Sequence, residues 1–141
     1  AQGAYERALS YALDRKQFGR PIAEFQGLQW MMADMSIGLE ASRALLHNAA
    51  KGAGSSFPNM EAAAKAKVLA SETAIKVTND ALQIHGSMGY SRSLDLERHV
   101  RDARMFTIAG GTAQILRTQI ASKILGIRIP QRRDGYLRHN S

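Results

Sequence analysis

Two long stripes of apolar and small side chains, in which steps of three and four residues alternate, constrain the fold of this 141-residue chain most strongly. The first stripe comprises Phe25, Leu28, Met32, Met35, Leu39, Ser42, Leu46 and Ala49, and the second comprises Ala64, Val68, Ser71, Ile75, Thr78 and Leu82. This spacing places one face of a long helix against neighbours that lie nearly parallel to it. The sequence therefore predicts two long packed helices. The first ends at Gly52 and Gly54, and the second starts after Asn59 and stops near Gly86 to Gly89.

Three shorter segments extend the helical pattern. Residues 1–12 have helical apolar spacing, and residues 93–105 form a shorter segment rich in charge. Residues 115–125 form an amphipathic segment that Thr112 can cap and Gly126 can close. No segment has the alternation of a convincing strand, so nearly all of the chain is predicted to be helical.

This arrangement predicts an all-α fold, an antiparallel (up-down) four-helix bundle with an additional short helix. The bundle is expected to span residues 1–127, and the basic residues 128–141 are expected to form an extended C-terminal tail. The helical spacing is already present at Ala1, so we expect the chain to be one domain of a longer protein.

The formal net charge is +7, from 19 basic and 12 acidic residues. A basic excess of this size is compatible with nucleic acid, with an anionic cofactor or with solubility alone. No zinc-finger, RNA-recognition or KH signature accompanies the arginines, so we expect no nucleic-acid partner. The pairs Glu97 with Arg101 and Arg98 with Asp102 have i,i+4 spacing, which favours a solvated helix face or a subunit contact.

Several classes of chemistry are excluded by composition. The chain has no cysteine, which rules out disulfides, thiolate metal sites and thiol catalysis. The four histidines are scattered without metal-ligand spacing, and no nucleophile elbow is present, so we expect neither a metal site nor acyl-enzyme chemistry. No apolar run approaches the roughly 20 residues of a membrane span.

Two short segments between predicted helices carry candidate ligand contacts. Arg15 lies before a turn formed by Gly19 and Pro21, where it can stabilise a helix end or pair with a phosphate through its guanidinium fork. Gly86 and Gly89 can end a helix, or they can let the backbone approach a ligand closely. For each segment the structural interpretation and the functional one both remain open.

A third segment, MFTIAGGTAQILR, places two glycines and a threonine directly before a helix. The free backbone amides of a first helical turn, together with the helix dipole, attract phosphate or a developing negative charge. The segment has neither the lysine of a phosphate loop nor a preceding strand, so it is not a site for a nucleoside triphosphate.

Four motifs in register closely resemble the C-terminal helical domain of acyl-CoA dehydrogenases. They are RKQFGRPIAEFQ, ADM, AAAKAKVLASETAIKVTNDALQIHGSMGY and ERHVRDARMFTIAGGTAQILR, and the likeness covers the chain up to about Ile127. The resemblance implies a flavoprotein that also has an N-terminal helical domain and a middle β domain. It further implies a homotetramer or homodimer in which the C-terminal bundles meet and FAD lies between subunits.

The resemblance also implies that one chain contacts two FAD molecules. The segment around Arg15, Gln26 and residues 83–87 would contact the FAD of a neighbouring subunit, and the start of the last helix would hold the other. Gly111 would contact the substrate. The implied cofactor-binding residues are Arg15, Gln26, Gln83, Ile84, His85, Gly86, Ser87, Thr112, Ala113 and Gln114.

The chain departs from the family pattern at two positions. The family usually has QIxGG, whereas Gly86 is followed here by Ser87, which should fit only if the backbone does not need a positive φ at that position. Many members also carry a glutamate in Tyr-Glu-Gly-Thr that removes the α-proton of the acyl thioester. The matching residue here is Gly110, which has no side chain and cannot act as a base.

Three explanations for Gly110 stay open. In the first, the base stands on the helix that begins this domain, upstream of Ala1, as in isovaleryl-CoA and long-chain dehydrogenases. In the second, the protein has abandoned α-proton abstraction and acts as a reductase, an oxidase or a non-catalytic flavin binder. In the third, a nearby residue supplies the base. The missing side chain leaves room for a branched or bulky acyl group.

The resemblance implies α,β-desaturation of an acyl-CoA with hydride transfer to FAD and electrons passed to an electron-transfer flavoprotein. The domain alone is expected to be inactive, because it lacks the middle domain. The expected compartment is bacterial cytoplasm, with the mitochondrial matrix as an alternative. A different class of protein, a helical oligomerisation module without redox chemistry, also fits the helical pattern.

Overall fold

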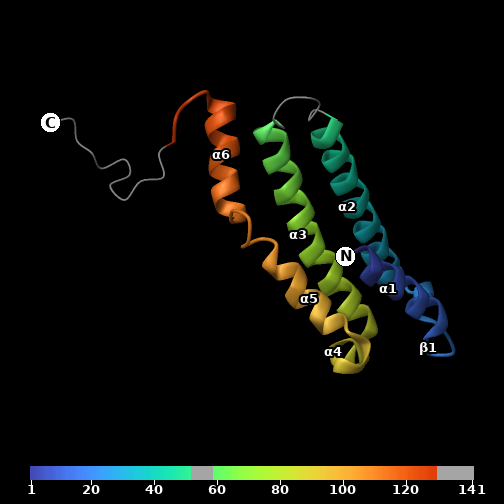
Figure 1. Ribbon diagram of the computed structural model, residues 1–141. Helices are drawn as coiled ribbons and strands as arrows, with labels where there is room; N and C mark the ends of the chain where they lie inside the picture. The colour runs from blue at the N-terminus through green and yellow to red at the C-terminus, as the bar shows by residue number, and fades with distance from the viewer. Residues whose placement is uncertain (52–58, 130–141) are drawn as a thin grey trace.

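The computed structural model describes residues 1–51 and 59–129, and these residues are mostly helical (Figure 1). Its helices are α1 (Gln2–Asp14), α2 (Gln26–Lys51), α3 (Met60–His85), α4 (Ser87–Tyr90), α5 (Leu96–Met105) and α6 (Ala113–Leu125). The all-α prediction is confirmed. The predicted end of the first long helix at Gly52 and Gly54, and nearly all of the predicted tail, lie outside the described residues.

Helix α3 is the central element, and the other long helices pack along it (Figure 1). Helix α2 runs antiparallel to α3, and the ideal Cβ position of Gly38 lies only 3.0 Å from Cγ2 of Thr73. Helix α1 runs parallel to the C-terminal half of α3, where the rings of Tyr11 and His85 stack at 4.3 Å. Helices α5 and α6 follow each other along the remaining side, so together they occupy the fourth position of the bundle.

The core lies where α1, α2 and α3 meet. Its buried members are Ala4, Ala8, Ala12, Ile22, Met35, Leu39, Val77, Ala81, Ile84 and Leu96. The alanines of α1 are fully buried, which allows the close approach to α3. Of the predicted stripe in α2, Leu46 differs from expectation, because its side chain is 56% exposed at the edge of an open groove between α2 and α3.

Predicted helix ends are confirmed at three positions. The side chain of Asn59 accepts hydrogen bonds from the backbone N–H of Glu61 at 3.0 Å and of Ala62 at 3.3 Å. Thr112 caps α6 by accepting from the N–H of Ile115 at 3.2 Å. Gly126 closes α6 with a φ of +66°, a conformation that glycine adopts without steric cost.

The corner between α1 and α2 differs from the prediction, because it contains a small β-hairpin. Strand β1 (Lys16–Gln17) pairs antiparallel with β2 (Arg20–Pro21), and a 3-10 turn (Ile22–Glu24) leads into α2. Both turn residues, Phe18 and Gly19, have positive φ values of 51° and 80°. Strands of two residues are too short to produce an alternating pattern, so no periodicity predicted them.

One predicted charge pair on α5 is confirmed and the other is wrong. Arg101 donates to Glu97 at 2.9 Å, as the spacing indicated. Arg98 lies 3.4 Å from Asp95 and not beside Asp102. Side chains on a helix tilt toward its N-terminus, which directs Arg98 back to the residue that precedes the helix.

Candidate functional site

Two predicted cofactor contacts lie at the hairpin end of the bundle. The backbone N–H of Arg15 donates to Tyr11 O at 2.8 Å, and Arg15 O accepts from the N–H of Ile22 at 2.8 Å. These bonds fix the main chain where α1 ends. The side chain of Arg15 is exposed, as is that of Gln26 at the first position of α2, so both remain available to a ligand.

Phe18 is a candidate site residue that sequence reasoning missed. It lies at the hairpin tip, 91% exposed, with a φ of 51° that bulky residues rarely adopt. Its ring meets the ring of Phe25 edge to face at 6.2 Å, and the guanidinium of Arg20 lies 4.3 Å above Phe25. The sequence signal for this residue was a phenylalanine directly before Gly19, at a position where two-residue hairpin turns usually have asparagine.

The end of α3 divides its predicted contacts between solvent and core. Gln83, Gly86 and Ser87 are exposed, whereas Ile84 and His85 are buried at 6% exposure each. The Nδ1–H of His85 donates to the carbonyl oxygen of Ala81 at 2.8 Å, and the imidazole ring stacks on the ring of Tyr11 in α1. In this segment, the side chains of Gln83 and Ser87 are therefore available to a ligand, and those of Ile84 and His85 are not.

The two glycines of this segment have different roles. Gly86 has a φ of +58°, and nothing lies within 4 Å of its ideal Cβ position. Ser87 begins α4 and does not have a positive φ. A serine therefore fits where the family usually has its second glycine. A Cβ on Gly89 would lie 2.5 Å from Leu82 O, so this glycine permits close packing of α4 on α3 and not the approach of a ligand.

The third predicted segment forms a tight loop before α6. Gly110 and Gly111 have φ values of +68° and +95°, and the ideal Cβ position of Gly110 faces open space. Gln114 is exposed, whereas Ala113 is 2% exposed and its N–H donates to Thr107 O at 3.0 Å. Part of the first turn is thus already hydrogen-bonded within the chain, which leaves fewer free amides than expected.

Side chains from α3 anchor this loop and the helix that follows it. Lys67 donates to Gly111 O at 2.6 Å. Arg117 forms a two-bond pair with Glu72, with N–O distances of 2.6 and 2.7 Å. The loop is therefore fixed near the middle of α3.

The loop lies away from the hairpin end. Glu72 and Ile84 are twelve positions apart on α3, which corresponds to about 18 Å along the axis. The candidate contacts accordingly form two separate clusters, one around Arg15 and the end of α3 and the other around Gly110 and the start of α6.

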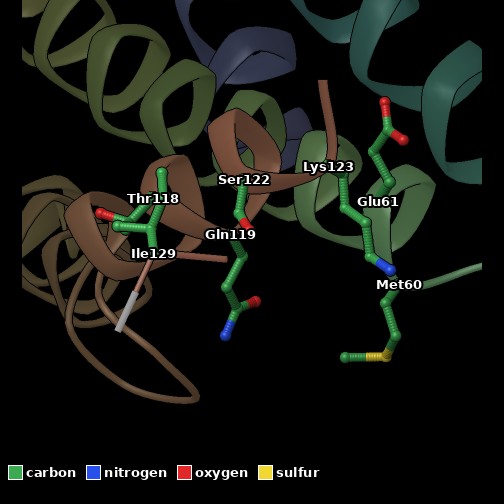
Figure 2. Close-up of a pocket in the computed structure, with 7 residues that line it drawn as sticks. All are labelled: Met60, Glu61, Thr118, Gln119, Ser122, Lys123 and Ile129. Atoms are coloured by element: carbon green, nitrogen blue, oxygen red, sulfur yellow. The ribbon is translucent and has the colours of Figure 1, made fainter. Parts of the chain in front are cut away.

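A pocket between the beginning of α3 and α6 belongs to neither cluster (Figure 2). Its lining residues are Met60, Glu61, Thr118, Gln119, Ser122, Lys123 and Ile129. Glu61 is already paired with Lys65 at 2.5 Å, so its charge is compensated within α3. The pocket offers no converging set of free polar groups, and we assign it no chemistry.

The described residues also limit what else the chain can hold. Across 1–51 and 59–129, no three His, Asp or Glu side chains are grouped as metal ligands. Among the helices in these two ranges, none combines the length and the apolar character that a membrane span requires.

The family model described as acyl-CoA dehydrogenase, C-terminal domain, matches residues 1–125. The chain belongs to the acyl-CoA dehydrogenase family. The match covers α1 to α6 and includes both clusters of candidate contacts.

Curated relatives in the acyl-CoA dehydrogenase family have different activities. The chain is 68% identical over 137 residues to 3-sulfinopropanoyl-CoA desulfinase of Cupriavidus necator, which covers 97% of the chain and 34% of that protein. It is 41% identical to the short-chain acyl-CoA dehydrogenase of Clostridium acetobutylicum, over 88% of the chain and 33% of that protein. The chain therefore spans about a third of the length of the curated relatives it matches.

Solved structures share the fold of this chain. Butyryl-CoA dehydrogenase from Megasphaera elsdenii matches with a TM-score of 0.85 at 36% identity, over 88% of this chain and 33% of that one. PigA, solved in complex with FAD, matches with a TM-score of 0.83 at 32% identity, over 89% of this chain and 32% of its own. The helical fold is therefore the C-terminal domain of this family.

The ion pair between Glu72 and Arg117, which anchors α6 in this acyl-CoA dehydrogenase domain, predicts a small dependence of stability on pH. Hydrogen bonds from Arg117 hold the pKa of Glu72 below its ordinary value. A carboxyl group with a lowered pKa stabilises the folded state at pH values above its pKa in the unfolded chain, about 4.3. This stabilisation is lost as the pH falls through the pKa of the group in the folded state. Because both side chains are about half exposed, we expect a loss below about 1 kcal/mol.

Thermal unfolding of the full-length protein and of a Glu72→Gln variant between pH 6 and 3 measures this contribution. The difference in midpoint between the two should shrink as the pH falls. A difference that stays constant over this range would show that the pair contributes nothing through ionisation.

Proposed function

We propose that this chain is the C-terminal domain of an FAD-binding enzyme that removes sulfinate from 3-sulfinopropanoyl-CoA. The observation that carries the proposal is Gly110, which provides no base where family resemblance implies a glutamate. Four relatives named 3-sulfinopropanoyl-CoA desulfinase are 65–69% identical to the chain, which supports this choice over the other open explanations.

The chemistry of desulfination agrees with an absent base. One water and the sulfinate anion give a propanoyl group and hydrogen sulfite: the C3–S bond breaks, C3 gains a proton, and sulfur gains an oxygen. The balance leaves no electrons for an external acceptor, so no carboxylate is needed to start an oxidation. A glutamate at position 110 would also place a negative charge in the substrate site, where a sulfinate would be repelled.

The residues of the chain fit a dinucleotide at both clusters. Arg15 provides an exposed guanidinium for a pyrophosphate, Phe18 provides an exposed ring, and Gly86 leaves open space beside the backbone. At the start of α6, the exposed Gln114 would contact a second FAD, while the buried Ala113 supports the backbone from within. FAD, when bound, supplies the hydride acceptor that desaturating members of the family use.

The separation of the two clusters supports assembly from like subunits, because each cluster would serve a different flavin. Exposed apolar side chains also favour covered surfaces: Trp30 and Ile37, two turns apart on α2, are 63% and 66% exposed. We propose a homotetramer or homodimer in bacterial cytoplasm, with the acyl-CoA as substrate.

Desaturation is the second candidate function, with a base upstream of this domain. It is favoured by the 41% identical short-chain dehydrogenase and by the fold of butyryl-CoA dehydrogenase. This activity requires an electron acceptor, and an electron-transfer flavoprotein would be the partner. The caffeyl-CoA reductase–Etf complex subunit of Acetobacterium woodii is 42% identical to this chain, which supports such a partner.

The full-length flavin-loaded protein distinguishes these functions. We expect it to release sulfite from 3-sulfinopropanoyl-CoA without bleaching the flavin, and to leave propanoyl-CoA and butanoyl-CoA unchanged under anaerobic conditions. Flavin bleaching by a saturated thioester without sulfite release would establish desaturation instead. Flavin that responds to no thioester would indicate a non-catalytic flavin binder, and absence of bound flavin would support the oligomerisation module.

A further inference from the structure

The loop that carries Gly110 and Gly111 has little steric restraint of its own. Both residues lack a Cβ and have positive φ, so the peptide planes around them can rotate into other allowed conformations. Local hydrogen bonds restrain only the flanks. Ala109 donates to Met105 O at 2.9 Å, and Ala113 donates to Thr107 O at 3.0 Å.

One side chain from a distant part of the sequence contacts the glycine pair directly. The ammonium group of Lys67 in α3 donates to the carbonyl of Gly111 at 2.6 Å, across 44 residues of sequence. A charged donor makes a stronger hydrogen bond than a neutral one. This bond fixes the peptide plane between Gly111 and Thr112, and thereby the direction in which the loop enters α6.

The stem of Lys67 lies in surroundings that hold it in place. The residue is half-buried and lines an open, largely apolar groove between α2 and α3. Its neighbours in that groove include Ala63, Ala66, Ala70 and Phe106. Apolar contact along the methylene stem reduces the entropy lost when the ammonium group is directed to one acceptor.

The partner of Lys67 sets it apart from other lysines on the same helix. Lys65 pairs with Glu61 at 2.5 Å, and Lys76 pairs with Asp80 at 2.7 Å. Those are ordinary i,i+4 ion pairs on a helix surface. Lys67 instead has its ammonium group near the N-terminus of α6, where the helix dipole disfavours a cation, so helix stabilisation does not explain its position.

We propose that Lys67 is a positioning residue that holds the Gly110–Gly111 loop in the conformation that receives the acyl thioester. The role is indirect, because Lys67 acts through the Gly111 carbonyl and not on the substrate. The inference rests on the proposed function in one respect, the assignment of this loop to the substrate. Its structural part, restraint of the loop, is independent of which reaction occurs.

The test uses the full-length flavin-loaded protein with Lys67→Met, which keeps most of the stem and removes the donor. We expect kcat/KM for the thioester to fall about tenfold, within the range that a small misplacement of a site can cause. We also expect faster hydrogen exchange at the backbone amides of residues 108–113. Lys67→Arg, which keeps a cationic donor, should recover part of both properties.

Lys76→Met is the matched control, because it removes an exposed lysine from the same helix, and it should behave as wild type. Unchanged exchange over 108–113 in Lys67→Met would overturn the proposal. So would faster exchange spread equally over α3 and α6, which would make Lys67 a general stabilising residue. If the wild type acts on no thioester, the proposed function fails, while the exchange data still decide the restraint.

Discussion

A Gly110→Glu variant of the full-length protein is expected to reduce its flavin with butanoyl-CoA at least about 10²-fold faster than any residual rate of the wild type, since a positioned base usually contributes about 10²- to 10⁴-fold. The substitution returns a carboxylate to the position that the family resemblance assigns to α-proton abstraction. Open space surrounds the ideal Cβ of Gly110, so the side chain can be accommodated. The φ of +68° adds strain of about 1–2 kcal/mol, which the domain should tolerate.

The same variant should release less sulfite from 3-sulfinopropanoyl-CoA, because its carboxylate would repel the sulfinate. Anaerobic flavin bleaching and sulfite release are measured side by side. Gly110→Gln is the control, since it has nearly the same shape without a charge or a base, and it should gain no bleaching activity. Rapid bleaching by the wild type, unchanged in Gly110→Glu, would instead locate the base elsewhere in the protein.

Arg15→Ala should weaken FAD binding by about 100-fold, the loss expected when hydrogen bonds to a charged group worth up to about 3 kcal/mol are removed. The exposed guanidinium stands at the fixed end of α1 and can bind a phosphate through two parallel N–H groups. The measurement is the dissociation constant of FAD from full-length apoprotein, followed by flavin fluorescence. Arg15→Lys should be intermediate, because lysine keeps the charge without the fork.

Arg43→Ala provides the control for Arg15→Ala. Arg43 is also exposed, but it lies on α2, where it donates to Gln2 at 2.7 Å. Its loss should leave FAD affinity unchanged. Equal weakening in both variants would point to a general effect of net charge, and unchanged affinity in Arg15→Ala would remove this residue from the cofactor site.

The long helices could be predicted because burial in a bundle repeats with the period of the helix. Met35 and Leu39 in α2, and Val68 and Thr78 in α3, are buried where the stripes placed them. Helix caps could also be predicted, since the hydroxyl of Thr112 satisfies a backbone donor that every helix start leaves unpaired.

Features fixed by a few atoms could not be predicted in this way. The hairpin at Phe18 depends on two positive φ values and on strands too short to have a period. The burial of His85 follows from its stacking on Tyr11, a contact between residues 74 positions apart. The contact between Lys67 and Gly111 is equally non-local, and side-chain spacing contains no information about a backbone acceptor.

The candidate site was predicted mainly from family resemblance, because its residues come from segments that are far apart in the sequence. Arg15 and Gln83 are separated in sequence and are joined only by the packing of α1 on α3. The loop at Gly110 belongs to a second cluster about 18 Å away along α3. Periodicity describes how a helix is buried, and it does not describe what an exposed end of that helix binds.

The packing at Gly89 has a consequence for comparing homologous chains. A methyl group there would lie 2.5 Å from the backbone oxygen of Leu82 and 2.9 Å from Cβ of His85, so every other amino acid would force α4 away from α3. Because the ring of His85 is held by its stacking on Tyr11, His85 cannot easily move aside, and α4 must take up the shift. Position 89 is therefore a sequence marker: homologues with another residue there must build this corner differently, and can be sorted before their structures are known.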